Sequence, residues 1–162
     1  MRYAEKDDLS AIVAIYNSAV MTRLSTADTA KVTPGARVEW FQKHTPDKRP
    51  IFVQEADNEI VAWVSFESFY GRPAYDHTAE ISIYVTPRHQ GRGMGRQLLE
   101  KSIKMTPKLG IKTLIGFIFS HNEPSLRLFN SFGFKQWGIL PDIAEMEGTE
   151  YSLSILGKRV NP

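Results

Sequence analysis

A glycine-rich turn is the first part of this sequence whose residue types could do chemistry. It reads Gln90-Gly91-Arg92-Gly93-Met94-Gly95 and lies between a predicted strand and a predicted helix. Glycine lets the backbone approach a ligand closely, and the free amides at the start of a helix point at an anion. From Arg88 to Lys112 the chain holds seven Lys and Arg residues and the single acid Glu100. The turn therefore predicts a site for a small polyanion, although a solvated helix face would also explain these charges.

Two familiar phosphate-binding motifs do not fit this turn. The dinucleotide fingerprint needs the spacing G-x-G-x-x-G and an acid about 20 residues further on. Here the spacing is G-x-G-x-G, and residues 110–119 hold no acid. The P-loop ends in Gly-Lys followed by Ser or Thr, whereas this turn ends in Gly95-Arg96-Gln97. The basic residues are not interleaved with aromatic ones, so we do not expect nucleic-acid binding.

Arg72 is a second residue with a chemical use, because Arg can bind a carboxylate through two parallel hydrogen bonds. It begins the segment Arg72-Pro73-Ala74-Tyr75, between Gly71 and Pro73 and close to Phe69. This segment could hold the carboxylate of an amino acid while the amine faces the reacting centre. The alternative is an exposed loop arginine without a ligand.

Composition excludes several other kinds of site. The chain has no cysteine, so disulfides, zinc–thiolate sites and a catalytic thiol are all excluded. Its four histidines, at positions 44, 77, 89 and 121, lack the spacing of metal ligands, and we predict no metal site. No apolar run approaches the roughly 20 residues that span a bilayer. The first residues mix charges and lack the apolar core of a signal peptide, so we expect a cytoplasmic protein without a membrane segment.

The elements that must position these residues follow from the hydrophobic pattern. A length of 162 residues suits one domain, residues 1–162. Strands that alternate with helices predict an α/β fold around a sheet of mixed direction. The three tryptophans, Trp40, Trp63 and Trp137, have apolar neighbours and are expected in the core. We expect helices over residues 9–19, after Thr33-Pro34, over 96–105 and from 122 to 132, and strands over 51–53, 60–66, 79–85, 113–119 and 151–156.

Two motifs together resemble those of a known superfamily. Gln90-x-x-Gly93-x-Gly95, after a strand and before a basic helix, resembles the pyrophosphate-binding motif of the GNAT acyltransferases. The segment 122–129, Asn-Glu-Pro-Ser-Leu-Arg-Leu-Phe, closed by Phe132-Gly133-Phe134, resembles their second cofactor motif. From end to end the chain is similar to the phosphinothricin and methionine-sulfoximine acetyltransferase branch, on Ile15-Tyr16-Asn17, Arg72–Tyr75 and Thr78–Val85.

The resemblance implies an N-acetyltransferase with a GNAT fold, a mixed and mostly antiparallel central sheet flanked by helices. The cosubstrate would be acetyl-CoA, the acceptor a small-molecule amine and the assembly a homodimer. The strand at 79–85 would separate from the strand at 113–119, so that pantetheine lies between them. The cofactor-binding residues would be Ile83, Tyr84, Val85, Gln90, Gly91, Arg92, Gly93, Met94, Gly95, Arg96, Asn122 and Ser125.

The resemblance also suggests how the reaction is catalysed. Glu80 matches the glutamate that acts as general base through a water molecule, although a surface glutamate or an ion pair with Arg72 would also explain it. The backbone amide of Val85 would stabilise the oxyanion, and Arg72, Pro73, Ala74 and Tyr75 would bind the substrate. Without a cysteine, the simplest scheme is direct attack in a ternary complex.

Phe129 departs from the branch pattern, which places His or Tyr there to protonate the thiolate. Phe has no proton to give, so water or another residue would have to supply one. This lowers the expectation that phosphinothricin itself is a good substrate. An acetyltransferase for a polyamine or a protein N-terminus, and a CoA-binding module without turnover, remain the alternatives.

Overall fold

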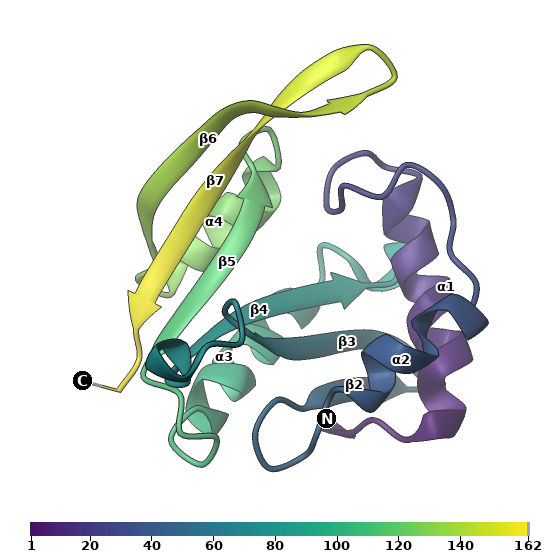
Figure 1. Cartoon of the computed structure of the whole chain (residues 1–162). Coiled ribbons are helices and arrows are strands. Elements are labelled where there is room, and N and C mark those ends of the chain that lie inside the picture. The colour runs from purple at the N-terminus through teal and green to yellow at the C-terminus, as the bar shows by residue number, and fades with distance from the viewer. Residues whose placement is uncertain (162) are drawn as a thin grey trace.

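A seven-stranded sheet of mixed direction forms the centre of the computed structural model, which describes residues 1–161 (Figure 1). The strand order is β1-β2-β3-β4-β5-β7-β6. Every neighbouring pair is antiparallel except β4 and β5, which run parallel. The strands are β1 (Arg2–Tyr3), β2 (Ile51–Ala56), β3 (Glu59–Ser68), β4 (Thr78–Val85), β5 (Thr113–Phe119), β6 (Lys135–Met146) and β7 (Thr149–Arg159).

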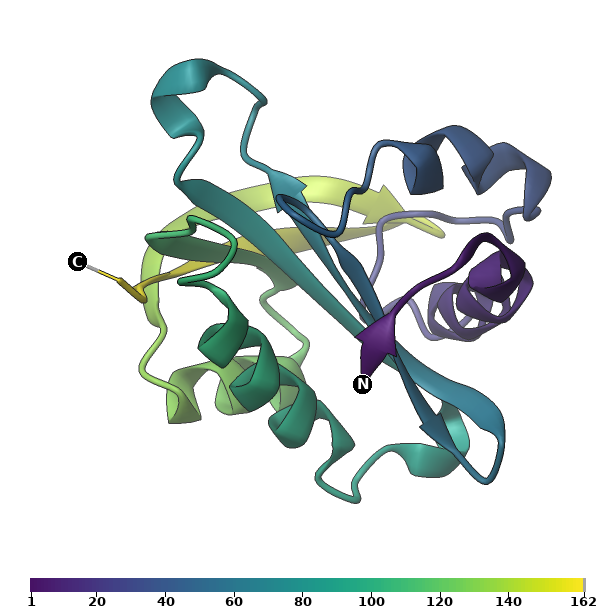
Figure 2. The same ribbon diagram turned by 90° about the horizontal axis from the view of Figure 1, so that it is seen from below.

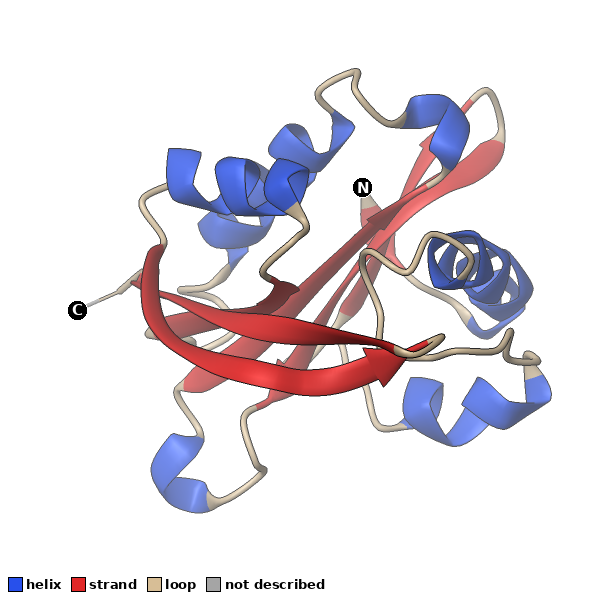
Figure 3. Ribbon diagram, turned by 90° about the horizontal axis from the view of Figure 1, so that it is seen from above, coloured by secondary structure: helices blue, strands red, loops and turns tan. Residues whose placement is uncertain are grey.

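Helices cover both faces of this sheet, with α1 and α2 on one side and α3 and α4 on the other (Figures 2 and 3). The helices are α1 (Leu9–Val20), α2 (Val38–Gln42), α3 (Met94–Met105) and α4 (Glu123–Ser131). The larger apolar core lies against α3 and α4 and includes Phe66, Leu99 and Leu114. A smaller core beneath α1 contains Ile12, Val53 and Trp63. Within residues 1–161, no helix is long and apolar enough to cross a membrane.

Strand alternation gives the two faces of β3 and β4 different chemistry. Val64, Phe66 and Ile81 are buried in the core beneath α3 and α4. Because successive side chains of a strand point to opposite faces, the residues between them face α1 and α2. On that face the strand register pairs Trp63 with Tyr84, Ser65 with Ser82, and Glu67 with Glu80. The sheet thus presents a row of polar and aromatic side chains on the α1 and α2 side.

The β4 and β5 strands separate after a short paired stretch. Their pairing extends only from Thr78 opposite Thr113 to Glu80 opposite Ile115. Beyond Glu80 the two strands diverge, as Figure 1 shows. This confirms the separation that the resemblance implied, and it leaves backbone groups of β4 free to bind a ligand.

Most predicted elements are confirmed, and the differences are two strands that were not expected, β1 and β6, and several shifted boundaries. The helix expected from residue 96 begins at Met94, and the last strand extends from Thr149 to Arg159 rather than over residues 151–156. Strand β6 was not expected, because Gly138 and Pro141 interrupt its apolar residues, and a Pro within a run argues against a strand. The prediction that Trp137 lies in the core is wrong. It is 51% exposed on edge strand β6, where its ring covers the backbone of Gly157.

Candidate active site

The separation of β4 and β5 opens a groove that joins two adjoining cavities. One cavity, of about 390 Å³, is lined by the glycine turn and the start of α3. The other, of about 450 Å³, contains Glu80 and is bordered by the β6–β7 hairpin. Both cavities are lined by Ser25, Ile83, Tyr84, Asn122, Ser125 and Phe129. A long ligand could therefore extend from the glycine turn to Glu80.

The glycine turn has the backbone geometry that its sequence requires. Gly91 and Gly93 have φ angles of 71° and 79°, a left-handed region that residues with a Cβ rarely adopt. Gly93 is the N-cap of α3, so the amides that follow it have no helical partner and remain available to an anion. Gln90 donates from Nε2 to the Val85 carbonyl over 2.9 Å, which ties the turn to the end of β4. This geometry fits a pyrophosphate group.

The predicted cofactor residues come together around this groove. Of the twelve, eleven line the smaller cavity, the larger cavity or both; Arg92 lines neither of them. Asn122 is buried, and its Oδ1 accepts the N–H of Ser125 over 3.2 Å at the start of α4. Two helix starts therefore face the groove, one from α3 and one from α4.

Backbone groups of β4 point into the groove. The N–H of Thr86 bonds to the Val61 carbonyl over 2.8 Å on the β3 side. Since the backbone groups of successive strand residues point to opposite sides, those of Ile83 and Val85 point away from β3, toward the opening. No strand pairs with this side beyond Glu80 in the part of the chain described. The Val85 amide is therefore placed to donate to a ligand oxygen.

Glu80 lies where the groove begins, as the last residue of β4 that pairs with β5. Burial, and then the nearby carboxylate of Glu67, raise the pKa of Glu80 to about 7. No Lys or Arg side chain of residues 1–161 forms a salt bridge with it, so the ion pair with Arg72 is not seen. A carboxyl group with this pKa can accept a proton near neutral pH.

Phe129 occupies the position at which the similar acetyltransferases have a His or Tyr that protonates the thiolate. It is buried and lines both cavities, and a Cβ at Gly116 would lie only 2.9 Å from its ring. Gly116 on β5 thus makes room for the ring. The surface here is apolar and offers no acid for a departing thiolate.

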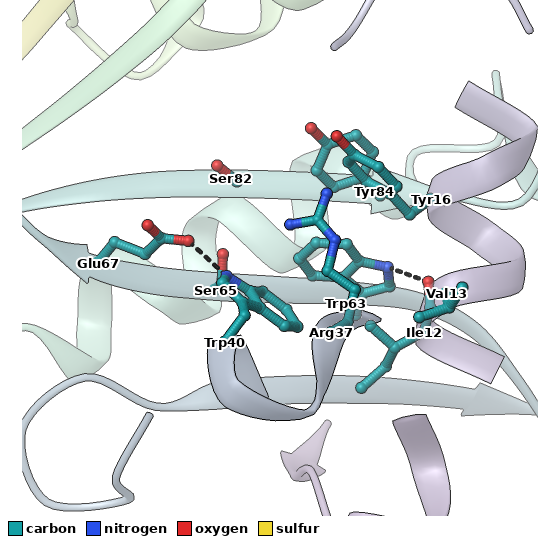
Figure 4. A pocket seen from close by; sticks show the side chains of 10 residues that line it. All are labelled: Ile12, Val13, Tyr16, Arg37, Trp40, Trp63, Ser65, Glu67, Ser82 and Tyr84. Carbon is teal, nitrogen blue, oxygen red and sulfur yellow. Dashed lines mark hydrogen bonds between the residues drawn. The ribbon is translucent and has the colours of Figure 1, made fainter. Parts of the chain in front are cut away.

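A third cavity, of about 140 Å³, lies on the α1 and α2 side of the sheet (Figure 4). It shares Ser82 and Tyr84 with the cavity that contains Glu80. Its walls include four aromatic side chains, and its polar groups are two serines, one arginine and one glutamate. The residues concerned are Tyr16, Trp40, Trp63, Tyr84, Ser65, Ser82, Arg37 and Glu67.

Arg37 and Glu67 are residues of this cavity that the sequence interpretation missed. The Arg37 guanidinium lies over the Tyr16 ring at 4.6 Å and pairs with Asp28 at 2.9 Å. Glu67 accepts a hydrogen bond from Trp40 Nε1 over 2.8 Å. No motif marks these residues. Alternation along the β3 strand, which puts Glu67 on the same face as Trp63 and Ser65, was the one signal that could have found Glu67.

The Arg72 segment lies on an exposed loop between β3 and β4, where Pro73–Tyr75 form a 3₁₀ turn. None of its four residues lines the three cavities described above. The Arg72 side chain makes no hydrogen bond within residues 1–161, so it is available to a ligand. The loop joins the strand ends that carry Glu67 and Glu80, which places it beside the groove.

Buried Arg49 holds the far end of this loop. Its Nη2 donates to the carbonyl of Asp76 over 2.6 Å and to that of Thr78 over 3.5 Å. Lys48 adds a surface ion pair with Asp76 at 3.4 Å. The start of β4, two residues before Glu80, is therefore fixed by a buried guanidinium.

Comparison with known proteins agrees with this geometry. The family model described as "Acetyltransferase (GNAT) family" matches residues 13–134. YwnH of Bacillus subtilis (strain 168) is 52% identical over 162 residues, which are 99% of each chain. The L-amino acid N-acyltransferase MnaT of Escherichia coli (strain K12) is 32% identical, over 96% of this chain and 91% of its own.

Two further matches, one of sequence and one of structure, come from Salmonella typhimurium. Its L-methionine sulfoximine/L-methionine sulfone acetyltransferase is 30% identical, over 96% of this chain and 91% of its own. The structure of yncA with its cofactor acetyl-CoA has a TM-score of 0.91 and 29% identity, covering 99% of this chain and 92% of that one. The chain is therefore an N-acetyltransferase of the GNAT family and belongs to its phosphinothricin and methionine-sulfoximine acetyltransferase branch.

Proposed function

We propose that this single domain transfers the acetyl group of acetyl-CoA to the amine of an amino acid or an analogue. Phosphinothricin, methionine sulfoximine and methionine sulfone are the analogues expected. The observation that carries the proposal is the position of Glu80, in a cavity that continues into the one lined by the glycine turn. By their names, the Salmonella relative is an acetyltransferase for methionine sulfoximine and sulfone, and the Escherichia relative is an N-acyltransferase for L-amino acids.

Acetyl-CoA fits the groove on chemical grounds. The amides of residues 94–96 at the start of α3 would hold its pyrophosphate, and Arg96 adds a positive charge beside them. Asn122 and Ser125 would contact the pantetheine arm along the separated edge of β4. When bound, the cosubstrate supplies an activated acetyl thioester.

Glu80 is proposed to take the proton of the acceptor ammonium, through a water molecule. An ammonium has no lone pair, so it cannot attack until a base removes a proton. With a pKa of about 7, Glu80 is substantially ionised at neutral pH and also basic enough to accept that proton. A placed general base contributes roughly 10²–10⁴-fold to the rate.

Val85 is proposed to stabilise the negative charge that develops on the acetyl oxygen. Its N–H points into the groove and needs no rearrangement to donate. The thiolate that departs would be protonated by water, because Phe129 cannot supply a proton. Attack would be direct, within a ternary complex, since the chain has no cysteine to carry the acetyl group.

The acceptor carboxylate is proposed to bind at Arg72, with Pro73, Ala74 and Tyr75 beside it. The free guanidinium and the position of the loop next to Glu80 support this assignment. Tyr75 packs edge-on against Phe69, with ring centroids 5.3 Å apart, and this contact would give the loop a preferred shape.

A homodimer is also proposed, as the resemblance implies. Three apolar side chains on edge strand β6 support it, because they lie exposed in the isolated chain. They are Trp137, Ile139 and Ile143, with exposed fractions of 51%, 48% and 58%. Large exposed apolar side chains gathered on one edge strand often mark an interface.

The test is thiol release from acetyl-CoA with a panel of amines. The panel contains phosphinothricin, methionine sulfoximine, methionine sulfone, common amino acids, spermidine and a short peptide. Saturable release with the amino acids or their analogues is the expected result. Thiol release only with spermidine or the peptide would contradict the proposal that the acceptor is an amino acid. No thiol release, although acetyl-CoA binds, would favour a CoA-binding module without turnover.

A further inference from the structure

A second carboxylate, Glu67, lies directly opposite Glu80 on the neighbouring strand. Directly opposite residues of an antiparallel pair have Cβ atoms about 4.5–5.5 Å apart, and like charges there are destabilising. Both carboxylates lie on the face of the sheet that is turned toward α1 and α2, in the same row as Ser65 and Ser82. Because pairing these two carboxylates lowers stability, we look for a role of the pair in the function of the site.

We infer that Glu67 binds the ammonium group of the acceptor beside Glu80, before that group is deprotonated. The inference rests on the proposed function and adds a residue and a charge requirement to it. The acceptor would enter as a cation held between two carboxylates. One N–H bond of the ammonium then breaks, its proton passes through a water molecule to Glu80, and Glu67 keeps its negative charge.

The surroundings of Glu67 hold its carboxylate in place. Its Oε1 accepts from Trp40 Nε1 over 2.8 Å and lies 3.9 Å from Nε2 of His44. His44 is itself anchored, since its Nδ1 donates to the Trp40 carbonyl over 2.7 Å. No hydrogen bond within residues 1–161 engages Oε2 of Glu67. One oxygen is thus fixed by the protein and the other is available to a ligand.

Lysine and arginine side chains of the described residues do not neutralise this pair of acids. Within residues 1–161, neither Glu67 nor Glu80 has a Lys or Arg partner within 4.0 Å. Arg37 lines the same cavity but pairs with Asp28 and lies over the Tyr16 ring. A cationic ligand would supply the missing partner.

The walls of the cavity also suit an ammonium ion. Trp40, Trp63 and Tyr84 line it, and the Trp63 and Tyr84 rings stack at 4.6 Å (Figure 4). Aromatic faces attract cations, most strongly where water is excluded. The cavity reaches the groove through Ser82 and Tyr84, which line both. An ammonium held there would lie beside the carboxylate that deprotonates it.

The pH dependence of the reaction would carry the signature of Glu67. The titratable or charged groups around it are Glu80 on β4, His44 after α2, and Arg37, Tyr16 and Tyr84 around the cavity. Among the protein's other charges, Glu67 is the one that contributes to raising the pKa of Glu80. Removing the Glu67 charge should therefore move the acid limb of the kcat/KM profile to lower pH.

The experiment compares wild type with Glu67→Gln, using the amine of the panel that wild type acetylates best. We expect kcat/KM for the amine to fall about tenfold, mainly through a higher KM, because a charge-assisted contact is lost. The KM for acetyl-CoA should stay within about twofold, since Glu67 is remote from the glycine turn. Glu67→Asp keeps the negative charge and should therefore recover part of the lost kcat/KM. A residue with a purely structural role would show no such recovery.

The matched control is Glu59→Gln, which removes an exposed carboxylate at the other end of the same strand, paired only with Arg88. It should leave both Michaelis constants and the pH profile as in wild type. An unchanged amine KM and pH profile in Glu67→Gln would overturn this inference alone. No turnover by wild type with any amine of the panel would overturn the proposed function as well.

Discussion

At the scale of single residues, environment decides the chemistry of Glu80. An exposed glutamate is fully ionised and weakly basic at neutral pH, whereas burial and the charge of Glu67 raise the pKa of Glu80 to about 7. At the point where β4 separates from β5, a glutamate can therefore act as a general base near neutral pH. Glu67 has a different role because its Oε1 is bound to Trp40.

This environment should make the stability of the protein depend on pH. The pKa of Glu80 is about 7 in the folded protein and 4.5 in the unfolded chain. Between these pH values the folded protein therefore binds more protons than the unfolded chain does. The contribution of Glu80 to the free energy of unfolding should therefore decrease as pH rises from 4.5 to 7. Glu80→Gln should remove this contribution, as urea unfolding at pH 5 and pH 8 would show. A pH dependence identical in both proteins would contradict the assigned pKa.

At the scale of elements, the turn before α3 depends on left-handed backbone conformations. Gly93→Ala puts a Cβ on a residue with a φ of 79°, which is strained by about 1 kcal/mol even though the space is open. We expect the KM for acetyl-CoA to rise severalfold and the KM for the amine to change little. Steady-state kinetics with each substrate varied would measure both.

Gly138→Ala on β6 is the control for this substitution. Its added Cβ would lie in ordinary contact with Ile155 at 3.7 Å, and its φ is not left-handed. Acetyl-CoA kinetics should match wild type. If both glycine variants raised the KM for acetyl-CoA to the same degree, the turn would have no special role in binding it.

The loop between β3 and β4 depends on Arg49. Arg49→Met leaves the carbonyls of Asp76 and Thr78 without their buried donor, at a cost of roughly 1–3 kcal/mol. The melting temperature should fall by several degrees and the amine KM should rise, because the loop of Arg72 and the start of β4 lose their anchor. Thermal unfolding and amine kinetics would measure the two effects.

Lys48→Met is the matched variant for that experiment. It removes only the exposed ion pair with Asp76, and such pairs contribute about 0–1 kcal/mol. It should behave nearly as wild type. Equal losses in the two variants would show that general surface charge, rather than the buried guanidinium, positions the loop.

The same elements show what the sequence could predict. The glycine turn could be predicted because local backbone geometry dictates its residue types; both Gly91 and Gly93 have positive φ. Strand β6 could not, because Gly138 and Pro141 are typical of a loop and break its alternating apolar residues. Glu67 was missed because its role depends on the register between β3 and β4, which the exposed loop between them does not reveal.

At the scale of the whole molecule, the exposed side of β6 is the feature that an isolated chain leaves unexplained. If Ile139 and Ile143 lie in a homodimer interface, placing a charge there should separate the subunits, because burying an unpaired charge is costly. We expect wild type to elute at twice the monomer mass in light-scattering chromatography, and Ile139→Asp to shift toward the monomer. A monomeric wild type would contradict the proposed dimer.

The whole arrangement brings two helix starts, one unpaired strand edge and one partly buried acid to the same groove, and its central claim is that Glu80 is the base. The most direct test is kcat/KM for the amine against pH in wild type and Glu80→Gln, with acetyl-CoA affinity measured in parallel. We predict a wild-type profile that rises through about pH 7, a loss of roughly 10²–10⁴-fold at pH 7 in the variant, and unchanged acetyl-CoA affinity. Undiminished turnover in Glu80→Gln, with the same pH profile, would contradict the assignment.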